Sequence, residues 1–177
     1  MISAARRSAL IPAAAAAMLG AAAPAQDHQA EVERAIFDLC PKAIAKRLSL
    51  DDPATLTQIG YTATPPRKVE GGTDPRAVRG AGTSRIVLSA GGGSCGVWFG
   101  GADAPEMLRL FKKLRARAKA EGFKGGKMLR LGDSTPLFPY NRGGEAPLSL
   151  IFFAADAGGE FETSPAMTAV MMTKKGD

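Results

Sequence analysis

A possible disulfide between the only two cysteines, Cys40 and Cys95, constrains this chain more than any other sequence feature. Two thiols in an exported protein pair most simply with each other. We therefore predict one disulfide, Cys40–Cys95, that ties an N-terminal helix to a strand. The alternative is a reactive or metal-binding thiol pair. A metal site needs more ligands, however, and the sole histidine, His28, lies close to the N-terminus that would remain after cleavage of a signal peptide.

The first 25 residues predict a cleaved signal peptide, which is why an oxidising compartment is expected. Arg6 and Arg7 precede an apolar, alanine-rich stretch over residues 8–22, and the small residues Ala23 and Ala25 fit a signal-peptidase site. The apolar run, about 14 residues, is too short to cross a bilayer, and no nearby cysteine can carry a lipid, so we predict no stable membrane anchor. General secretion is the default route, and the arginine pair leaves the twin-arginine route open.

Cleavage before Gln26 would leave residues 26–177, which we expect to form a single α+β domain in the periplasm or outside the cell. Losing Arg6 and Arg7 reduces the 23 Lys and Arg to 21 against 17 Asp and Glu, a mildly basic balance. Such a surplus suits an anionic envelope component or a protein partner better than nucleic acid, which an exported protein would rarely meet.

Helical periodicity and capping residues predict three helices. The first begins near Asp27 and is kinked or restarted at Pro41. A short second helix spans 53–59, with Asp52 as N-cap. The third spans 104–121, with Asp103 as N-cap and Glu106 completing a capping box, and it buries one apolar stripe. The residues expected in that stripe are Met107, Leu108, Leu110, Phe111, Leu114 and Ala118.

Alternating or β-branched runs predict five strands, at 83–90, 94–100, 127–131, 148–154 and 166–173. The Pro- and Gly-rich segment 62–82 is interpreted as a long basic loop, and 132–147 and 156–164 as turns. The fold class is therefore α+β, with a two-layer, largely antiparallel sheet of about five strands, two or three helices and one disulfide.

The strongest candidate site is the polar side of the predicted helix 104–121. Its cations could bind an anionic lipid, an anionic glycan or an acidic partner, although a solvated helix face would look the same. These residues are Arg109, Lys112, Lys113, Arg115, Arg117 and Lys119.

Trp98 is a second candidate, because its strand neighbours on the same face are Gly96 and Gly100. An aromatic ring beside bare backbone could stack a sugar or another flat group, with Arg85 or Arg142 supplying polar contacts. The alternative is that Trp98 is simply buried in the core.

Motifs for catalysis are weak. Residues 92–96 match the G-x-S-x-G pattern around Ser94, but a strand is predicted to follow and no histidine base is nearby. We predict no catalytic residue, cofactor or metal. The expected function is a non-catalytic envelope binding module. An unrecognised hydrolase-like enzyme and a small-ligand carrier that uses Trp98 and several methionines remain alternatives.

Overall fold

The computed structural model describes residues 25–70, 72–101, 103–131, 135–144, 147–153 and 165–173. The predicted signal peptide, apart from Ala25, and the predicted turn at 156–164 lie outside these residues.

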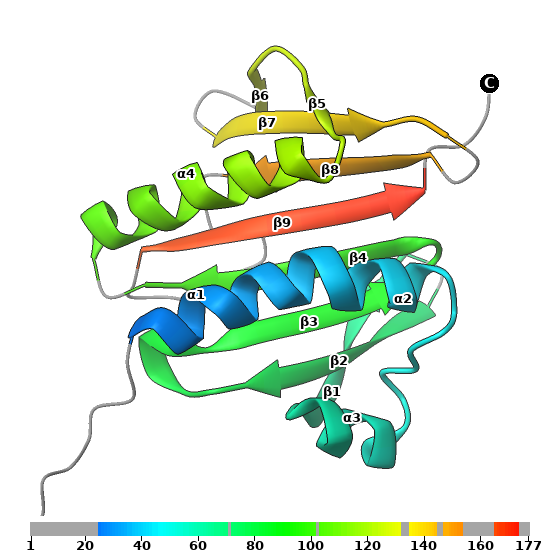
Figure 1. Cartoon of the computed structure of the whole chain (residues 1–177). Helices are drawn as coiled ribbons and strands as arrows, with labels where there is room; N and C mark the ends of the chain where they lie inside the picture. Colours follow the sequence, from blue (N-terminus) through cyan, green and yellow to red (C-terminus); the bar gives the residue numbers. More distant parts are fainter. Residues whose placement is uncertain are drawn as a thin grey trace, which may run out of the picture.

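One antiparallel sheet of nine strands joins the described parts of the chain, in the order β1-β2-β3-β4-β9-β8-β7-β5, with β6 also paired to β7 (Figure 1). The α+β class and the antiparallel pairing are confirmed, whereas the expected number of five strands is wrong. The strands are β1 (Thr62–Val69), β2 (Gly72–Arg79), β3 (Ile86–Gly91), β4 (Ser94–Gly100), β5 (Lys124–Gly125), β6 (Leu129–Leu131), β7 (Thr135–Arg142), β8 (Leu148–Phe153) and β9 (Ala166–Thr173).

The expected basic loop at 62–82 is largely the hairpin β1–β2, which corrects the prediction. Pro65 and Pro66 suggested a loop because proline cannot donate to a strand ladder. In the structure β1 is an edge strand, and its register with β2 shifts between Thr64 and Arg67, around the two prolines. An edge position and a bulge are where a sheet tolerates proline.

The expected turn at 132–147 contains β7, which includes Pro136 and Pro139. On one side β7 pairs continuously with β8. On its other side, pairing with β5 ends at Tyr140 and resumes with β6 only at Leu137. The ladder on the proline-rich strand is thus interrupted on one side only, and the strand survives.

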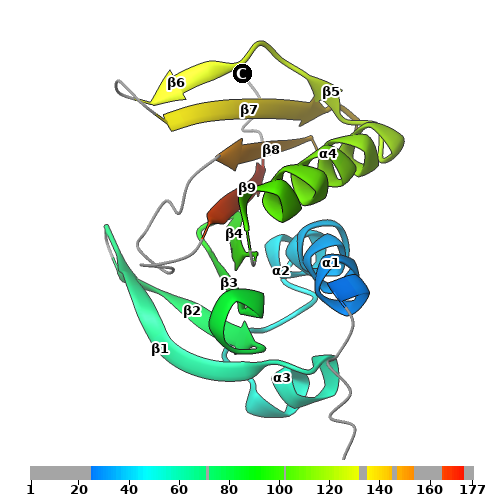
Figure 2. The same cartoon turned by 90° about the vertical axis from the view of Figure 1, so that its left-hand side faces the viewer.

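Three helical units cover one face of the sheet (Figure 2). The first runs through α1 (Ala25–Arg34), η1 (Ala35–Leu39), a wide π-helical turn, and α2 (Cys40–Ile44), which has Pro41 in its first turn. The predicted α3 (Pro53–Ile59) and α4 (Ala104–Ala120) are confirmed together with their caps: Asp52 accepts from Ala54 N and Thr55 N, and Asp103 accepts from Glu106 N at 2.6 Å.

The disulfide Cys40–Cys95 is present and joins α2 to β4. Cys95 shares the helix-facing side of β4 with Val97 and Phe99, and all three are buried in the core. The core between the helices and the sheet also includes Ile36 and Leu114. The crosslink therefore fastens the first helical unit to the middle of the sheet.

Candidate functional site

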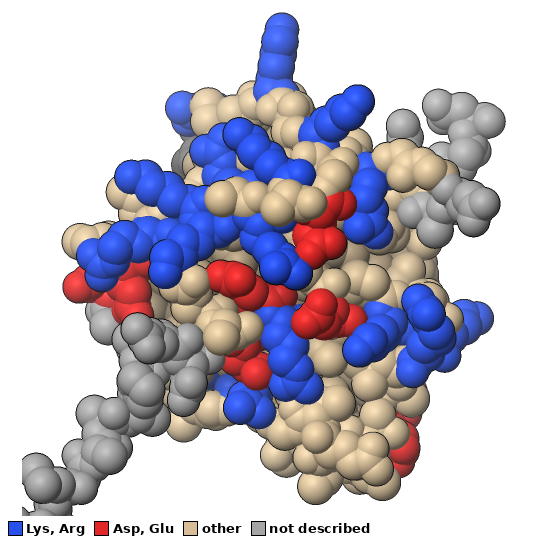
Figure 3. All heavy atoms as spheres, viewed as in Figure 1, with Lys and Arg blue, Asp and Glu red and all other residues tan. Residues whose placement is uncertain are grey.

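Helix α4 presents its predicted cations along the side that faces away from the core. Its buried stripe consists of Met107, Leu110, Phe111, Leu114 and Ala118, as expected. On the opposite side Arg109, Lys112 and Lys119 are exposed, and they make no hydrogen bond or ion pair with any described residue. Figure 3 shows Lys and Arg side chains gathered over α4 and the strands beyond it, whereas red and blue are mixed over α1.

The other cations of α4 are already engaged within the molecule. Arg115 is half-buried, and its Nε donates to Tyr140 Oη at 2.6 Å. Its guanidinium also lies 5.4 Å from the ring centres of Phe111 and Phe138. Arg115 therefore fastens α4 to β7, and its charge is partly used by this packing.

Two further cations of α4 make polar contacts with helix residues. Lys113 Nζ donates to Gln29 Oε1 of α1 at 2.6 Å. Arg117 forms an ion pair with Glu121 at 2.6 Å across one helical turn. The predicted cationic side thus divides into engaged residues, Lys113, Arg115 and Arg117, and free residues, Arg109, Lys112 and Lys119.

The segment after α4 extends this positive surface, which sequence reasoning missed. Residues 124–130 are all exposed and contain Lys124, Lys127 and Arg130, for which the described structure shows no side-chain partner. Over residues 104–131 there are nine Lys and Arg against two Glu, a net charge of +7 compared with +6 for the whole chain. We call residues 104–131 the basic segment. Counting charges along the sequence would have found it.

Apolar side chains lie among these free cations. Leu108 was expected to widen the buried stripe of α4, but it is 53% exposed. Met128 and Leu129 are 52% and 55% exposed between Lys127 and Arg130. An exposed leucine is common by itself. Here, however, three of the four large hydrophobic side chains found exposed among the described residues belong to the basic segment.

Trp98 lies on the sheet face opposite the helices and is only 3% exposed. Its ring lies over Gly96, where an added Cβ would be 2.4 Å from it, and the Arg67 guanidinium lies 4.7 Å from the ring centre. Arg85 directly precedes β3 and is half-buried. The Trp98 ring itself thus covers the backbone at Gly96. Trp98 therefore does not present the open stacking surface on which the predicted ligand binding depended.

A cleft of about 310 Å³ opens where the end of α2 meets the β3–β4 turn. Lys46, Asp51 and residues 90–94 are among its lining residues. Ser94 belongs to this lining, but its hydroxyl donates to Gly91 O at 2.9 Å and β4 follows it directly. His28 lies 2.7 Å from Gly100 O, at the other end of β4, about 20 Å away at the usual strand rise. The arrangement supplies no histidine base to Ser94.

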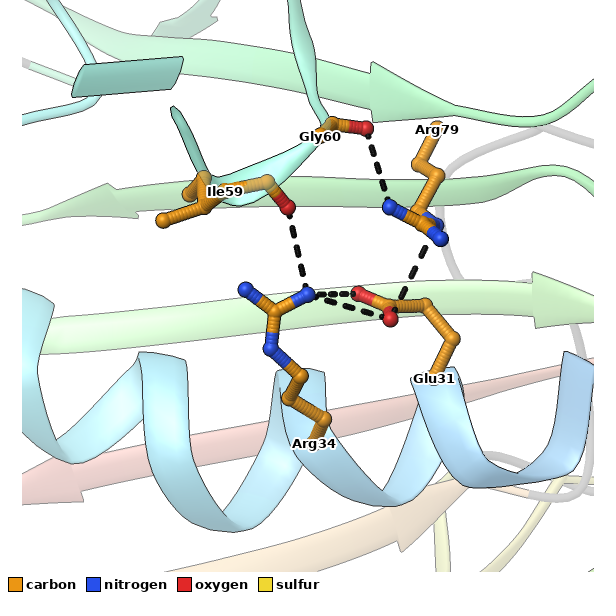
Figure 4. A network of polar contacts seen from close by, with 5 residues as sticks. All are labelled: Glu31, Arg34, Ile59, Gly60 and Arg79. Atoms are coloured by element: carbon orange, nitrogen blue, oxygen red, sulfur yellow. Dashed lines mark hydrogen bonds and ion pairs between the residues drawn. The ribbon is translucent and has the colours of Figure 1, made fainter. Parts of the chain in front are cut away.

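The acidic residues near α1 contrast with the basic segment. Glu31, 9% exposed, accepts from Arg34 Nη1 at 2.9 and 3.1 Å and pairs with Arg79 at 3.7 Å (Figure 4). The same two arginines donate to the carbonyls of Ile59 and Gly60, at the end of α3. This network joins α1, α3 and β2.

Tyr61 is buried beside this network. Its hydroxyl is buried and has no hydrogen-bond partner among the described residues. Burial, and then the nearby Glu31 carboxylate, raise the pKa of Tyr61 well above its ordinary value. These surroundings therefore favour the neutral form of Tyr61. The charged side chains around it, Glu31, Arg34 and Arg79, hold α1, α3 and β2 together.

Within the described ranges, no three His, Cys, Asp or Glu side chains come together to form a possible metal site. No described helix is both long and apolar enough to cross a membrane. Comparisons with protein-family models, curated proteins and solved structures found no match.

Proposed function

We propose that this protein is an exported, non-catalytic binding module that captures an anionic partner through the free cations of α4. The observation that carries the proposal is the exposure of Arg109, Lys112 and Lys119 without an intramolecular partner among the described residues. Their neighbours in the basic segment add to the same positive field. The disulfide supports the exported location, because such bonds persist in oxidising compartments.

Electrostatics explains why this surface suits binding better than folding. Like charges on one helix repel each other, so a cluster of nine cations opposed by only two glutamates does little for the stability of the fold. The same cluster creates a positive potential that attracts anionic partners and speeds their association. The entire positive excess of the chain lies in the basic segment, so the field is concentrated on one part of the molecule.

Salt-dependent retention on a sulfated or phosphorylated matrix tests this proposal. The protein is recovered after export with its disulfide intact, and its mass shows whether cleavage occurred before Gln26. The triple variant Arg109→Gln/Lys112→Gln/Lys119→Gln is expected to elute at clearly lower salt than the wild type, because it lacks the free cations.

A matched control separates the location of the charge from its total amount. Lys42→Gln/Arg47→Gln/Lys68→Gln also removes three exposed cations, but outside the basic segment. This control should elute close to the wild type. If both triple variants eluted at the same salt concentration, net charge alone would govern retention and the α4 surface would lose its proposed role.

Binding of a small zwitterionic ligand is a second candidate function, favoured by the cleft at the β3–β4 turn. The cleft has side chains of both charges, Lys46 and Asp51, and its volume lies at the lower end of that of ligand sites. A thermal-shift screen with amino acids and short peptides tests it. A stabilising ligand whose effect disappears in Asp51→Asn would support the site, and the absence of any stabilisation would reject it.

A further inference from the structure

The two parts of the basic segment, helix α4 and residues 124–131, both lie next to strand β7. Residues 108, 112, 115 and 119 follow one another along one flank of α4, and Arg115 places this flank beside Phe138 and Tyr140 of β7. Strand β7 pairs with β8 along one edge and with β5 and β6 along the other. The flank of α4 and residues 124–131 therefore border the same strand (Figures 1 and 2).

Cations and apolar side chains alternate along the basic segment. Lys112 lies one turn beyond the exposed Leu108, and the sequence Lys127-Met128-Leu129-Arg130 interleaves the two types directly. A leucine that is more than half exposed in a folded protein forgoes part of its hydrophobic stabilisation. Three such side chains beside free cations indicate a surface that is completed by something both anionic and apolar.

The headgroup region of a bilayer combines these two properties. Anionic phospholipids attract Lys and Arg near the surface, and apolar side chains that reach the acyl boundary add affinity without any pocket. An acidic protein would neutralise the cations, but it would need a matching hollow for each apolar side chain. The cleft at the β3–β4 turn is lined by no residue of the basic segment.

We propose that the basic segment docks reversibly on a bilayer that contains anionic phospholipids. Lys112, Lys119, Lys127 and Arg130 contact the headgroup phosphates, while Leu108, Met128 and Leu129 enter the headgroup region. This inference rests on the proposed capture of an anionic partner and names that partner. The opposite end of the sheet, with α3 and the hairpin β1–β2, then faces the solution (Figure 1).

Vesicle co-sedimentation of the exported, disulfide-intact protein tests the inference. One set of vesicles contains phosphatidylcholine alone, and the other contains phosphatidylcholine with phosphatidylglycerol. The partition coefficient should be at least about tenfold higher for the anionic vesicles, and it should fall as salt is added, because surface charges are screened. Equal binding to both sets, or to neither, would overturn the inference.

The apolar side chains distinguish a bilayer from other anionic partners. Met128→Ser/Leu129→Ser is expected to lower the partition to anionic vesicles about tenfold, because two partly exposed side chains no longer transfer from water. The same variant should elute from the anionic matrix like the wild type, since its charges are unchanged. Val69→Ser is the matched control, because Val69 is 38% exposed on β1, outside the basic segment.

The two readouts separate failure of this inference from failure of the proposed function. If matrix retention depends on Arg109, Lys112 and Lys119 but Met128→Ser/Leu129→Ser binds vesicles like the wild type, the bilayer is the wrong partner. An anionic protein or glycan would then take its place, and the proposed function would stand. If matrix retention does not depend on these cations, both proposals fail together.

Discussion

The helical unit α1–η1–α2 and helix α4 lie side by side on the same face of the sheet, but they differ in the balance and pairing of their charged residues. The unit α1–η1–α2 carries four acidic and two basic residues, whereas α4 carries one acidic and six basic residues. On α1 the buried Glu31 is held by Arg34 and Arg79, while on α4 three cations have no partner in the described structure. Charge on the first helix is therefore used within the fold, whereas only three of the six cations on the second are engaged among the described residues.

The two helical units also differ in whether a covalent bond attaches them to the sheet. Helix α2 is fastened to β4 by the disulfide, whereas α4 is held by noncovalent contacts, which include the packing of Phe111 against Phe138 and Phe152 and the hydrogen bond from Arg115 to Tyr140. The first helical unit is built as a fixed part of the scaffold. The second is held against the sheet by noncovalent contacts, and three cations on its outer side have no partner among the described residues.

The largest expected effect comes from removing the crosslink. Cys40→Ala/Cys95→Ala should lower the free energy of unfolding by about 4 kcal/mol, because the disulfide closes a long loop in the unfolded chain. Denaturant titration measures this loss, and reduced wild-type protein should match the double variant. A loss below about 1 kcal/mol would mean that packing alone fixes α2 and that the covalent contrast between the helices is unimportant.

The second prediction compares the loss of stability when one carboxylate is removed from each of the two helical regions. Glu31→Gln should cost about 2 kcal/mol, because it weakens charge-assisted hydrogen bonds at a largely buried site. Glu121→Gln removes the acid of the solvent-exposed pair with Arg117 and should cost less than about 0.5 kcal/mol. Denaturant titration of both variants provides the comparison. Equal losses would show that the network around Glu31 is no more stabilising than a surface pair.

The third prediction concerns alkaline pH and Tyr61. The pKa of Tyr61 is raised in the folded protein, so its hydroxyl contributes full stability below the unfolded-state pKa, near 10, and this contribution falls as pH rises further. The loss should approach about 1.4 kcal/mol per pH unit. Unfolding measured from pH 8 to pH 11 should show it.

Substitution of the two tyrosines in turn provides the control for this alkaline loss. Tyr61→Phe should flatten the dependence, whereas Tyr140→Phe keeps Tyr61 and should retain it. An unchanged slope in Tyr61→Phe would show that other groups near the α1 network account for the alkaline loss.

Sequence patterns predicted the elements that depend on near neighbours. The caps at Asp52 and Asp103 bond backbone amides only two or three residues ahead, so their signals are local and they were found. The strand β4 was also predicted with its bounds, because glycines mark both of its ends. The alternation along β4 placed Cys95 toward the helices, as the disulfide requires.

The missed features depend on distant partners. Whether Pro65 lies in a loop or in an edge strand is decided by β2, and whether Pro139 lies in a strand is decided by β5 and β8. The engagement of Arg115 depends on Tyr140, 25 residues further along the chain. The burial of Trp98 under Arg67 likewise joins two strands. Composition alone therefore located the basic helix but could not separate its free cations from its engaged ones.

The smallest expected effect compares how the two helical regions end. In both, the residue after the cap has a positive φ, and the next amide reaches back to the carbonyl five residues earlier: Arg47 to Lys42, and Phe123 to Ala118. Helix α4 uses Gly122 at the left-handed position (φ 83°), whereas α2 uses Lys46 (φ 56°), where a side chain is strained.

Lys46→Gly should therefore raise the free energy of unfolding by about 0.5 kcal/mol, because the relief of strain is partly offset by the greater freedom of glycine in the unfolded chain. Gly122→Ala should lower it by about 1 kcal/mol, through backbone strain alone, because an added Cβ would meet only Arg142 Cδ, at 3.8 Å. Thermal unfolding of both variants measures the pair, and a destabilised Lys46→Gly would show that contacts of the Lys46 side chain outweigh its backbone strain.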